Sequence, residues 1–302
     1  MIHLRLGIQN SAVSLRHVGW LATTVRQQQP DVRVDLHPVQ TRRDRLREEK
    51  AFIPGRPRHA FHELFDGLRA DEFDAAWLDV RDIPWPLPAG FVLAACAARR
   101  NPREAMLHRQ GTSFAELPPR TRLATTNEVA QWQIARLRPD IAWVTLGGDL
   151  PTRLHKLHLQ QADGVIESAS DLLALGFNEQ AFEFLSTDTM LPTPGQGVWA
   201  LCRLAERGDV QELAAPLDDA KARLCAATEL DFVAELAPPG DVPVAAWARV
   251  QRKKLMLDAC VADPERPDLV RLSISGPCAR GNDLVTALAD MFRQRGVRQA
   301  RR

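Results

Sequence analysis

The sequence of 302 residues has no tyrosine, few cysteines and no long apolar run. The five cysteines are widely spaced and include no Cys-x-x-Cys pair, which argues against a disulfide framework and against a cysteine zinc site. No apolar stretch reaches membrane-spanning length, and Arg5 interrupts any signal-peptide core. These absences predict a cytoplasmic protein that does not enter the membrane.

An excess of charge of either sign is also missing. Lys and Arg number 39 against 38 Asp and Glu, which gives a net charge of +1 and no general preference for nucleic acid. The arginine-rich stretch 293–302 has no interleaved aromatic residues, so we interpret it as a solvated tail rather than a nucleic-acid arm. The length allows two or three compact domains. We expect a monomer.

The first part of the chain has the pattern of a βαβ unit. Residues 2–8 alternate like a strand, and Ser11 can cap the helix that follows, where apolar residues recur at helical spacing. Residues 32–39 alternate again. A parallel pair of strands with a right-handed crossover is the default for such a unit. A helix at about 59–70 and strands at 74–80 and 91–97 are predicted to follow.

The next part repeats this logic, and a third part follows it. A strand at 122–126 leads into a helix capped by Asn127, and a return crossing is expected at 192–197, which is rich in proline and glycine. Two α/β halves joined by two crossings describe a hinged protein with ligand groups at strand ends facing a cleft. The remaining predicted elements are a strand at 141–146, a helix at 151–159, strands at 164–166 and 198–201, a helix at 222–236, strands near 244–249, 254–261 and 269–275, and a helix near 284–294.

Residues 78–84, Leu-Asp-Val-Arg-Asp-Ile-Pro, form the most informative motif. Asp82 directly follows Arg81 after the apolar run 73–77, and Pro84 closes the turn. A carboxylate on a strand-end loop beside a cation is typical of acid–base or cation-stabilising chemistry. Asp82 as a simple turn former is the alternative. We favour the functional interpretation.

This motif resembles the His-Ser-Leu-Lys-Asp-Val-Pro segment of hydroxymethylbilane synthases, also called porphobilinogen deaminases. Further segments resemble that family in order and spacing, namely 41–44 (Thr-Arg-Arg-Asp), 101–105 (Asn-Pro-Arg-Glu-Ala), 138–140 (Arg-Pro-Asp), 194–197 (Pro-Gly-Gln-Gly) and 227–229 (Ala-Thr-Glu). The resemblance implies a three-domain α/β fold whose first two domains are like periplasmic binding proteins, with a hinged cleft between them. The expected domains are 1–98 with 191–215, then 99–190, then 216–302.

The resemblance also implies where a site lies. Asp82 matches the family's catalytic aspartate, and Arg81 stands in place of the neighbouring lysine. The turn at Thr125, Thr126 and Asn127 could bind an anion through backbone N–H groups or could serve only as a helix cap, which we favour. Arg153 could hold a ligand or be a solvated helix residue. The positions expected to bind substrate are Arg81, Arg42, Arg153, Thr125, Thr126, Asn127, Gln9, Ser11 and Gln196.

Several positions depart from the family pattern. Family arginines are replaced by Gln9, Val129, Ala130 and Gly147, although each carboxylate of a polypyrrole needs a cation or donor when it leaves water. Gly240 stands where the family has the cysteine that carries a dipyrromethane. We therefore expect no dipyrromethane cofactor. No metal is expected either.

Two functions remain open on these residues. The first is a divergent hydroxymethylbilane-synthase-like protein that acts on porphobilinogen or a related small acidic pyrrole by deamination and condensation, with Asp82 moving a proton or stabilising a cation. The second is a catalytically inactive paralogue that binds a small ligand or a partner. Enzymatic activity of the porphobilinogen deaminase type is thus left undecided by the sequence.

Overall fold

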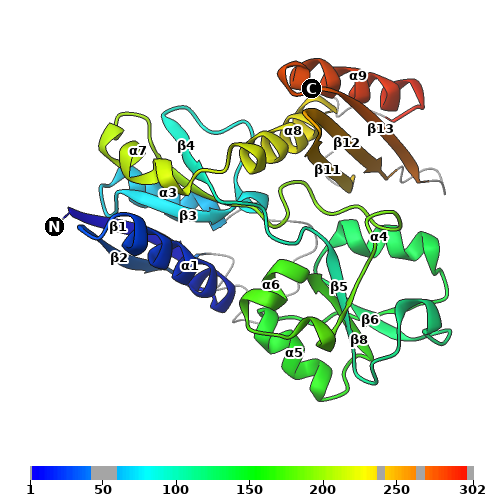
Figure 1. The fold of residues 1–302 in the computed structure, drawn as a ribbon. Coiled ribbons are helices and arrows are strands. Elements are labelled where there is room, and N and C mark those ends of the chain that lie inside the picture. Colours follow the sequence, from blue (N-terminus) through cyan, green and yellow to red (C-terminus); the bar gives the residue numbers. More distant parts are fainter. Residues whose placement is uncertain (1, 42–59, 237–241, 263–268, 298–302) are drawn as a thin grey trace.

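The computed structural model describes residues 2–41, 60–236, 242–262 and 269–297, and these form three sheets covered by helices (Figure 1). The α/β class expected from the sequence is confirmed. Every strand of each sheet falls within one of the three predicted domains. The domain boundaries themselves stay a prediction. The connecting segments contain short 3-10 helices, namely η1 (Val80–Asp82), η2 (Phe114–Glu116), η3 (Glu179–Ala181), η4 (Ala215–Leu217) and η5 (Cys278–Arg280).

The first sheet has the strand order β2-β1-β3-β10-β4. β1 runs parallel to β2 and β3, which confirms the predicted βαβ unit, whereas β10 is antiparallel to β3 and β4. β10 joins this sheet after the chain has passed through the second one, so the return crossing is confirmed. The strands are β1 (Ile2–Gln9), β2 (Val32–Val39), β3 (Ala75–Asp79), β4 (Phe91–Cys96) and β10 (Trp199–Leu204).

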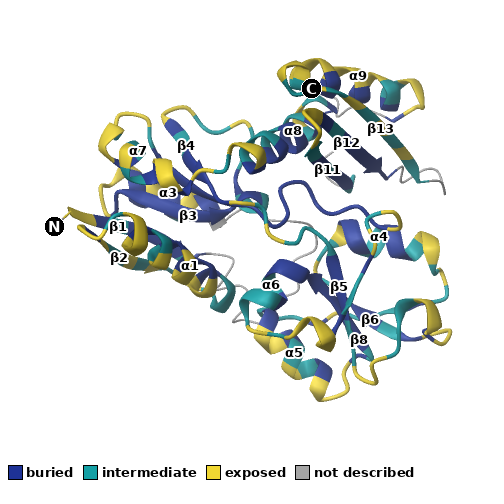
Figure 2. Cartoon of the chain, viewed as in Figure 1, coloured by how far each residue is buried: buried dark blue, intermediate teal, exposed yellow. Residues whose placement is uncertain are grey.

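Helices cover both faces of the first sheet. On one face α1 (Ala12–Gln28) and α7 (Gly208–Ala214) pack on the apolar side chains of β1, and on the other α3 (Ala60–Arg69) packs together with the start of α8 (Ala220–Leu236). The predicted cap of α1 is confirmed, because the Ser11 hydroxyl accepts the backbone N–H of Ser14 at 3.2 Å. Figure 2 shows the inner strand β3 buried, whereas the edge strand β2 and the outer faces of the helices are partly exposed.

The second sheet has the order β7-β6-β8-β5-β9. The strand expected at 141–146 is wrong in length, because only two residues stay in the ladder and the chain from Thr145 onward turns to line a cavity. β5 went unpredicted, since its sequence does not alternate. The elements are β5 (Glu104–His108), β6 (Arg122–Ala124), α4 (Glu128–Leu137), β7 (Ala142–Trp143), α5 (Leu150–His158), β8 (Gly164–Ser168), α6 (Ala169–Ala174) and β9 (Glu183–Phe184).

The third sheet is antiparallel with the order β11-β12-β13. Its strands are close to the predicted ones: β11 (Val244–Gln251), β12 (Lys254–Val261) and β13 (Val270–Pro277). Helices α8 and α9 (Gly281–Gln294) pack on this sheet around Phe232 and Phe292, which are both fully buried. Within the described ranges, no helix combines the length and the apolar character that crossing a bilayer requires.

The two crossings between the first and second sheets lie side by side. The backbone N–H of Arg100 donates to the carbonyl of Gly197 at 2.8 Å, and the Gln196 side chain donates to the carbonyl of Pro102 at 2.9 Å. Glu229 of α8, 1% exposed, accepts from Arg99 in one crossing and from the backbone N–H of Gly195 in the other. One buried carboxylate therefore anchors both crossings to the helix that leads into the third sheet.

Gly197 is a position where glycine is required. Its φ is +78°, and a Cβ there would lie 2.8 Å from the carbonyl oxygen of Arg100. We expect Gly197→Ala to lower the free energy of unfolding by about 1–3 kcal/mol, the usual cost of a strained backbone position. Gly208→Ala is the control, because a Cβ at Gly208 meets nothing within 4 Å. Equal stability of the two variants in urea would contradict the close approach of the crossings.

Candidate functional site

A cavity of about 250 Å³ lies between the first and second sheets. It is lined by residues at the carboxyl ends of β1, β3, β6 and β8 and at the start of α4 and α5. This is the edge at which α/β proteins bind ligands. The volume is near the lower end of the range for small-molecule sites, roughly 300–1,000 Å³, so the cavity suits a small ligand.

Most of the predicted site residues come together at this cavity. Those that line it are Gln9, Ser11, Arg81, Asp82, Thr125, Thr126, Asn127 and Arg153. Gln196 is 1% exposed and holds the crossings together instead. Arg42 and Gly240 lie outside the described residues. Substrate binding by any of these residues stays a prediction.

Asp82 reaches the cavity because of a turn formed by its neighbours. β3 ends at Asp79, whose side chain accepts the backbone N–H of Arg81 at 2.9 Å and so begins η1. Asp82 is the last residue of η1 and is partly exposed. The side chain of Asp79 therefore fixes the backbone turn that presents Asp82.

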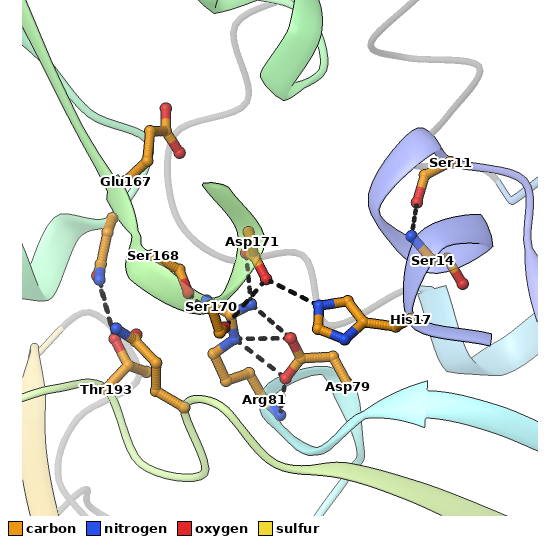
Figure 3. A network of polar contacts seen from close by, with 12 residues as sticks. Ser11, Ser14, His17, Asp79, Arg81, Glu167, Ser168, Ser170, Asp171 and Thr193 are labelled. Carbon is orange, nitrogen blue, oxygen red and sulfur yellow. Dashed lines mark hydrogen bonds and ion pairs between the residues drawn. The ribbon is translucent and has the colours of Figure 1, made fainter. Parts of the chain in front are cut away.

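Arg81 joins the first sheet with its helices, here called the first lobe, to the second sheet with its helices, the second lobe (Figure 3). Its guanidinium binds both carboxylate oxygens of Asp79 in the first lobe and donates to Asp171 of α6 in the second lobe at 2.9 Å. His17 of α1 lies 3.6 Å from the same Asp171 carboxylate and stacks on Trp199. Burial alone would raise the pKa of Asp171, but Arg81 and His17 outweigh it and hold that pKa well below its ordinary value.

Arg153 is buried rather than solvated, which excludes the second interpretation of this residue. It is 4% exposed, and its guanidinium donates to both Glu167 oxygens at 2.6 and 2.7 Å and to the carbonyl of Gly148 at 2.8 Å. A ligand carboxylate would have to compete with Glu167 for this cation. Both described cavity arginines are thus held in ion pairs with protein carboxylates.

The helix N-termini at the cavity are capped by the protein's own side chains. Asn127 accepts the backbone N–H groups of Val129 and Ala130 at 3.1 and 3.4 Å, so the favoured cap interpretation of this turn is confirmed. At α5, Asp149 accepts the N–H of Thr152 at 3.0 Å. These N–H groups would otherwise favour anions. The caps leave less room for an anionic ligand at either helix.

Glu104 is one of the cavity residues that sequence reasoning did not identify, as are Glu167 and Asp171. It begins β5 directly after the first crossing and is 3% exposed. Its Oε1 accepts the side-chain N–H groups of Asn127 at 2.6 Å and of Gln196 at 2.8 Å, whereas Oε2 is buried without a partner. Burial raises the pKa of Glu104 above its ordinary value. Its only signal in the sequence was a place in the segment 101–105, which marks the family rather than a site.

The charge of the cavity is negative among the residues that the structure describes. Seven carboxylates and two arginines line it, and no lysine does. The expected loss of positive lining residues is visible at Gln9 and Gly147, which line the cavity as uncharged residues. An ammonium group or an N–H donor is therefore a better match to this lining than a second carboxylate.

Comparisons with known proteins give the family. Residues 4–212 match the family model described as porphobilinogen deaminase, dipyrromethane cofactor binding domain. The porphobilinogen deaminase of Syntrophotalea carbinolica is 31% identical over 97% of this chain and 93% of its own length, and that of Roseiflexus sp. (strain RS-1) is 30% identical over 98% and 97%. Among solved structures, the VFT2 domain of Bordetella pertussis BvgS overlaps 76% of this chain and 91% of its own, with 15% identity and a TM-score of 0.42.

The expectation that the protein has no dipyrromethane cofactor is contradicted, because the matched model is that of the cofactor-binding domain. The expectation rested on the replaced arginines and above all on position 240, which lies beyond residues 4–212. The loss of one attachment atom does not by itself exclude a group that the rest of a cavity can bind. The cavity fits the ring N–H groups of a dipyrromethane, since the unpartnered oxygen of Glu104 can accept one. Its acidic groups would have to contact donors other than the paired arginines, such as the hydroxyls of Ser11 and Thr125. With a matching family model over more than half of its length and relatives that align end to end, this chain belongs to the porphobilinogen deaminase family.

Proposed function

We propose that the protein acts on porphobilinogen or a related small pyrrole with acidic side chains, through the deamination and condensation chemistry of its family. The single observation that carries this proposal is the place of Asp82, which lines the cavity on a turn fixed by Asp79 and Arg81. In this setting Asp82 moves a proton or stabilises the cation left when an amino group departs from a pyrrole ring.

The neighbouring side chains support this role for Asp82. Arg81 is held by Asp79 and Asp171, so it cannot swing away from the turn and it keeps the loop in one position. The negative lining favours an intermediate with positive charge. A bound dipyrromethane would supply the ring to which new pyrrole units are joined, and the Glu104 and Ser11 side chains are placed to contact it.

A second candidate is supported by the ion pairs. Because Arg81 and Arg153 are both occupied by protein carboxylates, the described cavity offers little compensation for the acidic groups of a growing chain of rings. A protein that binds one small ligand without turnover would be compatible with this lining. The cytoplasmic location and the monomeric state remain predictions under both candidates.

The test is consumption of porphobilinogen by the full-length protein and by Asp82→Asn. We expect the parent protein to consume it and the variant to be slower by about 100-fold or more, the usual size of a lost acid–base group. Asp188→Asn, a change at an exposed residue, is the control and is expected to leave the rate unchanged. A parent protein that binds porphobilinogen without consuming it would replace this proposal by the second candidate.

A further inference from the structure

Glu104 is a buried carboxylate whose contacts use only one of its two oxygens. Oε1 accepts two side-chain N–H groups, from Asn127 of the α4 cap and from Gln196 of the return crossing. Glu104 lines the same cavity as Asp82, and its Oε2 has no partner among the described residues, although the residue is only 3% exposed. An unpartnered buried oxygen costs stability unless something binds it. The site is thus built for a group that the protein itself does not provide.

The groups around Glu104 decide what that partner is. Two N–H donors on Oε1 favour the ionised form of the carboxylate, but burial outweighs them and raises the pKa of Glu104, so the ionised group lacks a donor at Oε2. The nearest charged groups include Glu167, itself paired with Arg153, and Arg81, paired with Asp79 and Asp171. None of these cations donates to Glu104. A ligand that presents an N–H group can donate the missing hydrogen bond to Oε2. A ligand carboxylate has no such donor and would place a second carboxylate against Glu104.

We propose that Glu104 binds a nitrogen donor of the ligand, either the ring N–H of a pyrrole or a protonated amine attached to it, and so orients the ligand in the cavity that Asp82 also lines. This deepens the proposed function, on which the choice of a pyrrole rests. The two amide contacts to Oε1 hold the carboxylate in one orientation, so Oε2 is preorganised as an acceptor.

Glu104→Gln separates binding from folding. Glutamine keeps an oxygen that accepts from Asn127 and Gln196 and replaces Oε2 by an amide that donates. Since burial raises the pKa of Glu104, its charged form is disfavoured in the folded state, and the variant is expected to unfold at a temperature no lower than the parent. Loss of binding in a variant of undiminished stability would show that the carboxylate is kept for a ligand.

The experiment is calorimetric titration of the full-length protein with three small probes that need no turnover. They are 2-(aminomethyl)pyrrole, its N-methylated form, which keeps the amine but lacks the ring N–H, and pyrrole-2-carboxylate. We expect the aminomethylpyrrole to bind in preference to the carboxylate, and Glu104→Gln to weaken it about 10-fold or more. Glu206→Gln, at an exposed residue, is the control.

The probes also identify which nitrogen is bound. If N-methylation abolishes the effect of Glu104→Gln, the ring N–H is the donor, and if the effect persists, the amine is. Tighter binding of pyrrole-2-carboxylate, or equal affinity of the amine for parent and Glu104→Gln, would overturn the inference. Since these titrations do not depend on porphobilinogen consumption, an inactive protein that still shows the preference would refute the proposed function and leave the role of Glu104 standing.

Discussion

Glu229→Ala is expected to lower the free energy of unfolding by about 3–5 kcal/mol, the cost of leaving one member of a buried ion pair alone. Glu229 accepts from both terminal nitrogens of Arg99 at 2.6 and 2.8 Å, and from the backbone N–H groups of Gly195 at 2.7 Å and Ala248 at 2.6 Å. These donors come from the two crossings and from β11. Removing the carboxylate leaves a buried guanidinium and two N–H groups without their acceptor.

Urea unfolding followed by far-UV circular dichroism measures this loss. Glu212→Ala on α7 is the control, because that residue is exposed and its replacement should change stability by less than about 0.5 kcal/mol. Arg99→Met should lower the free energy of unfolding less in the Glu229→Ala background than in the parent protein, because the guanidinium that it removes is already unpaired there. A loss below about 1 kcal/mol for Glu229→Ala would show that water replaces the carboxylate and that the three sheets are joined by other contacts.

Arg81→Met is expected to have a comparable effect and, in addition, to separate the lobes. The guanidinium is the only described cation that bridges Asp79 of the first lobe and Asp171 of the second, and both carboxylates are largely buried. Without it, two buried like charges repel each other across the cavity. We expect a loss of about 3–5 kcal/mol together with a larger radius of gyration in small-angle scattering.

The pH dependence of Asp171→Asn provides a separate check on this contact. The pKa of Asp171 is lower in the folded protein than in the unfolded chain, where it is about 3.9. Its ion pair therefore stabilises the fold above that pH and loses this contribution as the pH falls further. Asp171→Asn should be less stable than the parent near pH 7 and should lose less on acidification. For Arg81→Met of the preceding experiment, the control for the lost positive charge is Arg280→Met, which breaks an exposed ion pair with Asp283.

The sequence predicted the parts of the fold that depend on local pattern. The alternation in 32–39, the caps at Ser11 and Asn127, and the proline and glycine run of the return crossing each fix a local conformation without distant contacts. The match in residues 78–84 likewise placed Asp82 at a strand end. These elements follow from side-chain periodicity and backbone preference, which a single segment contains.

The electrostatics of the site could not be predicted in this way, because several charges in the cavity are paired with residues far apart in the sequence. By sequence Arg153 could be either a solvated or a ligand-binding helix residue, and its pairing with Glu167 appears only in the fold. Likewise nothing near Arg81 in the sequence indicated its contact with Asp171. Glu104 became informative only when its Oε2 proved to be buried without a partner. The sequence by itself determined the family and the elements that carry Asp82, since both follow from residues close together along the chain. Tertiary structure alone decided which cations are occupied and that Oε2 of Glu104 has no partner among the described residues, because the pairing of buried charges depends on distances in space.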